Sequence, residues 1–174
     1  MHLTLFLLYN EDRLFEMERG FHMNSFMKRA VELAADNVRE GGQPFGAVLV
    51  KDDEIIAEGV NELHIKYDVS GHAELLAIRR AQEALQTNEL KGFTMYASGC
   101  PCPMCLTSMY YAGIEDIYYC ASVEETKNAG LGAADVIYHD LAQPNEERQI
   151  VMKEMPLEAG MDNPMTMWKK RHSQ

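Results

Sequence analysis

The sequence predicts an α/β fold in which helices cover both faces of a mixed β-sheet. Segments with apolar residues at helical spacing alternate along the chain with short runs rich in β-branched and aromatic residues. This alternation is typical of a sheet packed between helices. The length of 174 residues suits one compact domain with a real core. Hydrophobic residues at 47% and charged residues at 25% are typical of a globular chain.

The first half of the chain predicts two helices around a hairpin. A helix is predicted over residues 24–40, because polar caps precede its apolar stripe and Gly41-Gly42 follows it. Strands over residues 45–51 and 54–61, separated by two aspartates, predict a hairpin. After a loop, apolar spacing predicts a second helix over residues 72–85.

The second half continues the alternation as far as residue 121. The predicted elements are a strand over 93–98, a helix over 103–112 with proline at its first position, a strand over 114–121, a short helix within 124–149, a return to strand near 150–153, and a terminal helix over 163–171. The sequence shows no internal repeat or linker, so we treat residues 23–174 as one domain.

Residues 1–22 fit this domain poorly. Their apolar run over residues 3–9 lacks a preceding basic region, is far shorter than a membrane span, and runs into Asn10, Glu11 and Asp12. We therefore expect neither a signal peptide nor a membrane anchor. We interpret residues 1–22 as an N-terminal extension, either non-native or an arm of an oligomer.

The charge of the chain disfavours polyanionic partners. The formal net charge is −11, from 27 acidic and 16 basic residues, so the average surface potential repels phosphate backbones and anionic membranes. The only dense basic group is Lys169-Lys170-Arg171, which is a small footprint for nucleic acid. We expect neither a nucleic acid nor a membrane as partner.

Three of the four cysteines lie within six residues, at Cys100, Cys102 and Cys105. This clustering does not form a disulfide framework and indicates metal or redox chemistry in a reducing compartment. We therefore expect a cytoplasmic protein. Cys120 ends an apolar strand and is predicted to be a core residue.

Two short segments carry the chemistry, His72-Ala73-Glu74 and Pro101-Cys102-Pro103-Met104-Cys105, and both lie at predicted helix starts. If Cys102 caps its helix, Cys105 lies one turn further, so the two thiols converge beside a positive helix end that favours thiolates. Two thiolates and one imidazole suit Zn²⁺, and three protein ligands leave a fourth position open for water. The sequence predicts one catalytic zinc per chain, held by His72, Cys102 and Cys105.

Glu74 lies two residues after His72, near the metal without ligating it. We predict that it transfers protons from water to a ring nitrogen and then to the leaving ammonia. Taken alone, Glu74 would be interpreted as a first-turn acid favoured by the helix dipole. The combined pattern His-x-Glu and Pro-Cys-x-x-Cys, however, is an established mark of zinc nucleobase deaminases.

The chain from residue 23 to about residue 171 resembles the cytidine deaminase-like superfamily and, within it, the bacterial guanine deaminases and related base deaminases. Besides the zinc motif, the segments that carry the resemblance are Pro44-Phe45-Gly46-Ala47-Val48 and Glu58-Gly59-Val60-Asn61. The resemblance implies a three-layer α/β/α fold with a mixed five-stranded sheet. It also implies a homodimer, with exchange of C-terminal segments as in guanine deaminases.

The resemblance further implies contacts with the base. Asn61 would hydrogen-bond the base, the backbone of Ala73 would read its carbonyl edge, and Phe45 would line or stack on the ring. Where guanine deaminases carry Gly-Phe-Asp-Asp, this chain has a run ending in Asp135, which is the candidate base-reading carboxylate, in a register open by one residue. Trp168 is the aromatic candidate that the chain end would bring to a site.

These observations together predict a zinc-dependent hydrolytic deaminase of a small purine-type base, with guanine (guanine and water to xanthine and ammonia) or a related triazine as substrate. Within the enzymes, the alternatives are a tRNA adenosine deaminase, against which the net charge argues, and a cytosine-type deaminase. A catalytically silent zinc-folded scaffold is the alternative from another class, but it has no need of Glu74. A structural zinc site would require a fourth ligand such as Cys100, His64 or His139.

Overall fold

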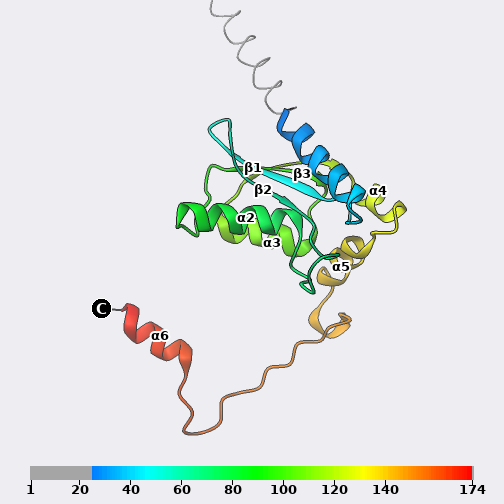
Figure 1. Cartoon of the computed structure of the whole chain (residues 1–174). Helices are drawn as coiled ribbons and strands as arrows, with labels where there is room; N and C mark the ends of the chain where they lie inside the picture. The colour runs from blue at the N-terminus through cyan, green and yellow to red at the C-terminus, as the bar shows by residue number, and fades with distance from the viewer. Residues whose placement is uncertain (1–24, 174) are drawn as a thin grey trace, which may run out of the picture. The chain divides into compact units, whose positions relative to one another are not determined.

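A computed structural model describes residues 25–173 of the chain (Figure 1). The predicted extension over residues 1–22 lies outside this range. The described residues fall into two compact units, Met1–His139 and Asp140–Gln174, each considered by itself. In chain order, the elements are a first helix over residues 25–39, β1 (Gly46–Lys51), β2 (Glu54–Val60), α2 (Ala73–Leu85), β3 (Thr94–Gly99), α3 (Pro103–Ala112), β4 (Asp116–Ala121), α4 (Val123–Asn128), α5 (Ala133–Leu141), the 3₁₀ helix η1 (Asn145–Glu147) and α6 (Pro164–His172).

The strands form one mixed sheet in the order β2-β1-β3-β4. β1 pairs antiparallel with both β2 and β3, whereas β3 and β4 run parallel and are joined through α3. The predicted α/β class and mixed sheet are confirmed, and the predicted strands and helices of this unit agree with the observed elements to within a few residues. The prediction that Cys120 is a core residue is wrong, because β4 is the edge strand and Cys120 is exposed there.

The predicted fifth strand near residues 150–153 is wrong, because the described sheet has four strands. The backbone N–H and C=O groups of a strand bond to a neighbouring strand. In the middle of this segment, they bond to a side chain instead. Asn145 donates from Nδ2 to the carbonyl of Met152 at 2.9 Å and accepts the Met152 N–H at Oδ1 at 3.1 Å. Both backbone groups of Met152 are thereby satisfied without a neighbouring strand.

The turn between β1 and β2 confirms the predicted hairpin. Asp52 and Asp53 have φ values of 49° and 60°. Positive φ at both central residues of a two-residue turn matches the twist of the strands, and aspartate tolerates this conformation better than most residues.

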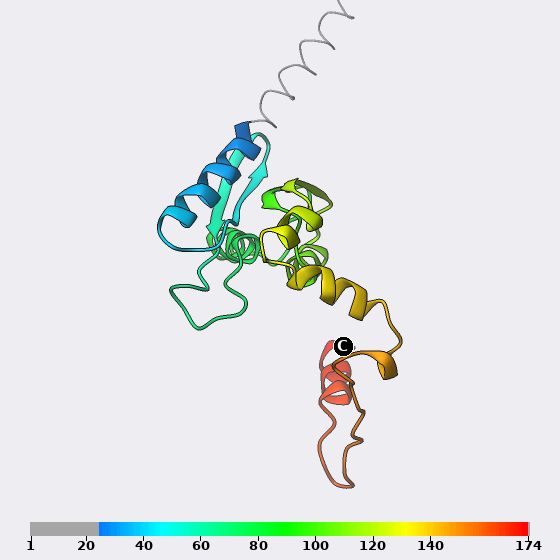
Figure 2. The ribbon, with the colours of Figure 1, turned by 90° about the vertical axis from the view of Figure 1, so that its right-hand side faces the viewer.

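Helices cover both faces of the sheet (Figures 1 and 2). On one face, Phe26 and Ala30 of the first helix pack with Val48, Val50 and Tyr96 of the strands. On the other face, α2 and α3 lie side by side and bury a larger apolar cluster against β1 and β3. The predicted layers are therefore present in the unit Met1–His139.

Gly59 of β2 allows α2 to begin close to the sheet. A Cβ atom at this position would overlap the backbone carbonyl of Ala73 and come within 2.9 Å of the amide nitrogen of Ala77. Only glycine permits this approach, because it has no Cβ. The approach fixes the first turn of α2, which carries Glu74.

The unit Asp140–Gln174 contains η1 and α6, and its described side chains are all at least partly exposed. In α6, Trp168 stacks on His172 with ring centroids 3.7 Å apart. Across residues 25–173, no helix is both long enough and apolar enough to cross a membrane.

Candidate metal centre and active site

The site begins at the starts of two helices. His72 and Cys102 are the N-cap residues of α2 and α3, and each has an extended backbone. An N-cap side chain usually accepts a hydrogen bond from its own helix. Neither of these does so. The His72 imidazole and the Cys102 thiol therefore face each other instead of capping their helices.

The three predicted ligands converge. His72 Nδ1 lies 3.5 Å from Cys102 Sγ and 3.6 Å from Cys105 Sγ, and the two sulfur atoms are 3.5 Å apart. Tetrahedral zinc, with bonds of about 2.3 Å to sulfur and about 2.0 Å to nitrogen, separates its ligand atoms by roughly 3.5–3.8 Å. The donor types and their spacing therefore fit zinc.

The electrostatics of the thiols also suit a metal. Hydrogen bonding with the Cys105 thiol and with His72 lowers the pKa of Cys102 to about 4. The interaction with Cys102, together with burial, raises the pKa of Cys105. The hydrogen bond with Cys102 in turn raises the pKa of His72. One thiolate is therefore preformed, and a cation is needed before the second thiol can ionise beside it.

Glu74 lies beside this group without belonging to it. Its side chain is buried, with 6% of the residue exposed, and its Oε2 lies 3.5 Å from Cys105 Sγ. Burial raises the pKa of Glu74. A carboxyl group with a raised pKa takes up a proton more readily than an ordinary glutamate, which favours a role in proton transfer.

Within the described part of the chain, no fourth side chain completes the group. Among residues 25–173, the only cluster of three or more His, Cys, Asp or Glu side chains able to hold a metal consists of His72, Cys102 and Cys105. Cys100, His64 and His139 are thus not ligands in the described structure, and the structural-zinc alternative loses its support. Three ligands leave a coordination position open for catalysis.

A cavity of about 550 Å³ adjoins the metal group, a size typical of small-molecule sites. It is lined mainly by apolar residues, with a few polar groups. The lining residues are Gln43, Phe45, Leu63, Val69, His72, Glu74, Cys100, Cys102, Pro103, Met104, Thr126, Gly130, Leu131, Gly132, Ala133, Ala134 and Ile137. The cavity can thus hold a flat ring beside Glu74, with polar groups at a few points of its wall.

Of the residues predicted to contact the base, Phe45 lines this cavity. Its ring packs against Gly99, where a Cβ atom would approach the ring to 3.0 Å. Asn61 and Ala73 are fully buried and are not among the lining residues. Their contact with a base stays a prediction.

Asp135 and Trp168 also stay predictions as base contacts. Asp135 accepts a hydrogen bond from Lys127 Nζ at 2.8 Å, which lowers its pKa, and it does not line the cavity, although the neighbouring Ala134 does. Trp168 belongs to the unit Asp140–Gln174.

Sequence reasoning missed two residues around the site. Gln43 lines the cavity directly before the Pro44-Phe45 pair. Tyr138 of α5 donates a hydrogen bond from its hydroxyl to the carbonyl of Pro101, at 2.8 Å. Burial raises the pKa of Tyr138 to about 12. The polarity of Gln43 beside a predicted ring contact was available in the sequence, whereas nothing in the sequence connects Tyr138 to residue 101.

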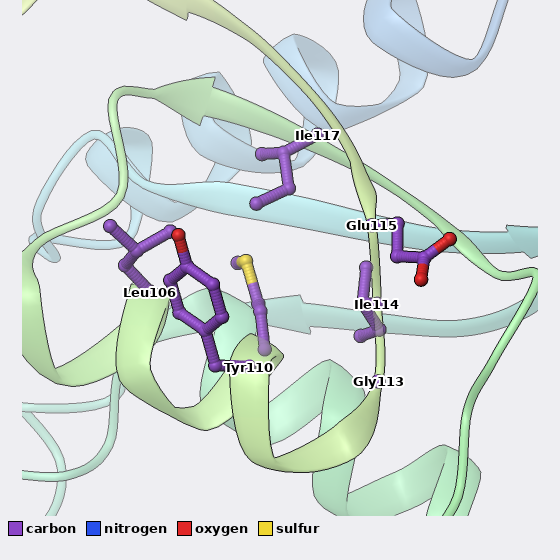
Figure 3. Close-up of a pocket in the computed structure, with 7 residues that line it drawn as sticks. Leu106, Tyr110, Gly113, Ile114, Glu115 and Ile117 are labelled. Atoms are coloured by element: carbon purple, nitrogen blue, oxygen red, sulfur yellow. The ribbon is translucent and has the colours of Figure 1, made fainter.

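A separate cavity of about 360 Å³ lies between α3 and the segment that leads into β4 (Figure 3). Its walls include Leu106 and Tyr110 from α3, and Ile114, Glu115 and Ile117. The lining contains no histidine or cysteine. This cavity therefore offers neither of the two side-chain types that make up the metal group.

Comparisons with known proteins agree with this geometry. Residues 22–121 match the family described as the cytidine and deoxycytidylate deaminase zinc-binding region. A guanine deaminase of Bacillus subtilis is 40% identical over 146 residues, which span 83% of this chain and 92% of the relative. Its crystal structure superposes with a TM-score of 0.78 at 39% identity, covering 84% of this chain and 93% of that one.

Other relatives match the chain at lower identity. A tRNA-specific adenosine deaminase of Aquifex aeolicus is 30% identical and spans 83% of this chain and 93% of its own length. Solved complexes with 2,6-diaminopurine and with 8-azaguanine, at 28% identity and a TM-score of 0.57, each cover 60% of this chain and about 60% of their own. The matched family, the metal group and Glu74 all agree, and the chain belongs to the zinc-dependent cytidine and deoxycytidylate deaminase family.

Proposed function

We propose that this protein is a zinc-dependent hydrolytic deaminase of a small purine-type base, with guanine or a related triazine as substrate. The observation that carries the proposal is the convergence of His72, Cys102 and Cys105 beside the buried carboxyl of Glu74, in a cavity sized for a base. The similarity to a guanine deaminase over most of both chains supports guanine in particular.

His72, Cys102 and Cys105 would hold the metal. Zinc bound by these residues would act as a Lewis acid that lowers the pKa of a water molecule next to the base. The preformed Cys102 thiolate and the nearby helix start favour a cation at this point. Both helices present their first turns to the same place, so the ligands are fixed before a metal arrives.

Glu74 supplies the proton transfers. In the overall reaction, water adds its oxygen to the carbon that bears the amino group, and ammonia leaves, so guanine becomes xanthine. Glu74 accepts the proton from water at its carboxylate, passes it to the ring nitrogen next to that carbon, and delivers a proton to the departing amino group. The low polarity around its buried side chain raises its pKa, which favours the uptake of a proton from water.

Phe45 lines the cavity and would stack on the base. We also propose that Asn61, Ala73 and Asp135 contribute to base recognition. Asn61 and Ala73 are fully buried, so they would act on the base through the residues that line the cavity. Asp135 would first have to break its hydrogen bond with Lys127.

A homodimer with exchanged C-terminal segments, in the cytoplasm, belongs to the same proposal. The exposed apolar side chains of the unit Asp140–Gln174, among them Ile150, Met155, Met165 and Trp168, support a protein partner for this segment. A second copy would bury them and bring Trp168 to a neighbouring site.

A tRNA adenosine deaminase remains the second candidate, because relatives with that activity match much of the chain. The net charge of −11 argues against a polyanionic substrate. A cytosine-type deaminase and a catalytically silent scaffold are the remaining alternatives, and the same experiment addresses them all.

The test is ammonia release from guanine, guanosine, adenine, cytosine, ammeline and a tRNA anticodon stem, measured with zinc-replete protein. We expect release from guanine or ammeline alone. Glu74→Gln should retain zinc and fold while turnover falls by about a thousandfold or more, because the proton carrier is lost. Turnover of the RNA or of cytosine would favour the corresponding alternative. Unchanged turnover in Glu74→Gln would exclude the proton-transfer role.

A further inference from the structure

The cavity wall contains one carboxamide, that of Gln43, which the metal chemistry does not use. The backbone of Gln43 is firmly held, because its carbonyl accepts hydrogen bonds from Asn37 Nδ2 and from the amide of Phe45, both at 2.8 Å. Asn37 is itself buried and also donates to the carbonyl of Asn61, at 2.9 Å. Gln43 is therefore a fixed part of the wall and not a loose surface residue.

The orientation of the Gln43 carboxamide follows from its neighbours. The backbone N–H of Leu63 can only donate, and it donates to Asn61 Oδ1 at 3.1 Å. The Nδ2 group of Asn61 consequently faces Gln43 and donates to Gln43 Oε1 at 3.3 Å. Because Gln43 Oε1 accepts from Asn61, the Nε2 donor is the end of the Gln43 carboxamide that does not bond to Asn61.

This donor has no hydrogen-bond partner among the described residues, although Gln43 lines the cavity. Asn61, in contrast, is fully buried and does not line the cavity. Of the hydrogen-bonded pair Asn61 and Gln43, only Gln43 reaches the cavity, and the group that it offers to a ligand is its Nε2 donor.

We propose that Gln43 Nε2 donates a hydrogen bond to the oxo group of the bound base and selects oxopurines over aminopurines. The inference rests on the proposed function, since it assumes that the cavity binds a purine. An oxo group accepts a hydrogen bond from Nε2, whereas an exocyclic amino group at the same ring position presents N–H groups to a donor and leaves it unpaired. A site built to hydrogen-bond one substituent discriminates strongly against an analogue that cannot make that bond.

The sharpest test compares guanine with 2,6-diaminopurine. The two bases share the 2-amino leaving group and differ in carrying an oxo or an amino group at position 6. The wild-type protein should show the higher kcat/KM with guanine. In Gln43→Glu, one carboxylate oxygen can still accept from Asn61 while the group toward the cavity becomes an acceptor. We expect the guanine to 2,6-diaminopurine ratio of kcat/KM to fall about tenfold or more, mainly through KM for guanine.

The ratio cancels the effect of the added charge on Glu74, because that effect acts on both substrates. Gln43→Met is the neutral control, since it removes the amide at similar length. It should lower kcat/KM for guanine and change that for 2,6-diaminopurine much less. Zinc content and Tm are measured for each variant to exclude a loss of fold.

Two results would overturn the inference: an unchanged ratio in Gln43→Glu, or a rise in kcat/KM for guanine in Gln43→Met, which would mean that Gln43 obstructs the base. Calorimetric binding of 8-azaguanine, which carries the same oxo group, separates this failure from that of the proposed function. If the wild type binds 8-azaguanine but releases no ammonia from guanine, the proposed hydrolysis is wrong. The inference about Gln43 then still predicts that the Gln43 variants bind 8-azaguanine at least about tenfold more weakly than the wild type. Absence of both binding and turnover in the wild type would overturn both.

Discussion

The metal-binding side of the cavity is built from two helix starts, whereas the remaining wall combines loop, strand-end and helix residues from distant parts of the chain. His72 and Cys102 hold equivalent positions before α2 and α3, and their ligand atoms already meet at zinc-like distances. On the other side, Gln43 and Phe45 precede β1, and residues 130–134 come from the segment around the start of α5. The comparison indicates that the reaction depends on short segments at two helix starts. The choice of substrate depends on residues that are distant in the sequence and that the fold brings together.

Metal removal should have the largest effect on the metal-binding side. Dialysis against a chelator should abolish ammonia release and lower Tm, because zinc binds the folded state and stabilises it by about 4 kcal/mol at a thousand times its Kd. Calorimetry with zinc quantified beforehand measures both effects. Restoration by zinc and not by magnesium is the control. Full activity in protein freed of zinc would contradict the assignment of the reaction to the metal-binding side of the cavity.

Gly59→Ala tests whether the backbone approach under α2 holds the metal-binding side in place. The added methyl group would overlap the carbonyl of Ala73, so we expect a loss of about 1–3 kcal/mol in the free energy of unfolding, together with weaker zinc binding. Urea unfolding measures the change in stability. Gly132→Ala is the matched control, because the closest atom to its new methyl group is the flexible Cγ of Lys127 at 3.2 Å, and the backbone of Lys127 stays at an ordinary contact distance of 3.6 Å. Equal stability of the two variants would contradict the packing argument.

Tyr138→Phe tests whether α5, which contributes to the substrate wall, also supports the metal side. The variant loses the hydrogen bond to the carbonyl of Pro101, which is worth about 1 kcal/mol, so zinc affinity should fall several-fold. Competition with a chromophoric chelator measures this affinity. Tyr110→Phe, which changes an exposed hydroxyl on α3, should leave it unaltered. Identical affinities in both variants would show that the two sides are independent.

The smallest effect is expected at an ion pair that does not line the cavity. Arg29 of the first helix makes a two-bond ion pair with Glu58 of β2, at 2.7 and 2.8 Å, and its hydrogen bond lowers the pKa of Glu58. Because both side chains are partly exposed, Arg29→Met should cost only about 1 kcal/mol at pH 7 and leave kcat unchanged.

The sign of its pH dependence follows from the lowered pKa. The stabilisation is complete above the ordinary glutamate value of 4.5 and is lost as the pH falls through the lower pKa of the folded state. The difference between wild type and Arg29→Met in urea unfolding should therefore narrow in acid. A difference that stayed constant from neutral pH into this range would show that Arg29 stabilises the helix by packing alone.

The metal ligands and Glu74 could be predicted from the sequence because each lies within a few residues of a helix start, so local rules place the side chains. The orientation of Gln43 could not be predicted, since it depends on a relay through Asn61 and the backbone of Leu63. The pairing of the Asp135 carboxylate with Lys127, one helix earlier in the chain, could not be predicted either, and the contact of Asp135 with a base stays a prediction. Strand-like composition near residue 150 predicted a strand that the hydrogen bonds of Asn145 replace.

The two hydrogen bonds between Asn145 and Met152 also have a consequence for solubility. The sequence Ile150-Val151-Met152 is apolar and exposed, which is the composition that adds to the open edge of another molecule's sheet and starts aggregation. By occupying both the N–H and the carbonyl of Met152, Asn145 removes the two groups on which intermolecular pairing would begin. Lys153 and Glu154 follow at once as charged gatekeepers. The Asn145 side chain thereby blocks strand pairing at this aggregation-prone segment, while the apolar side chains of the segment stay exposed for contact with a protein partner.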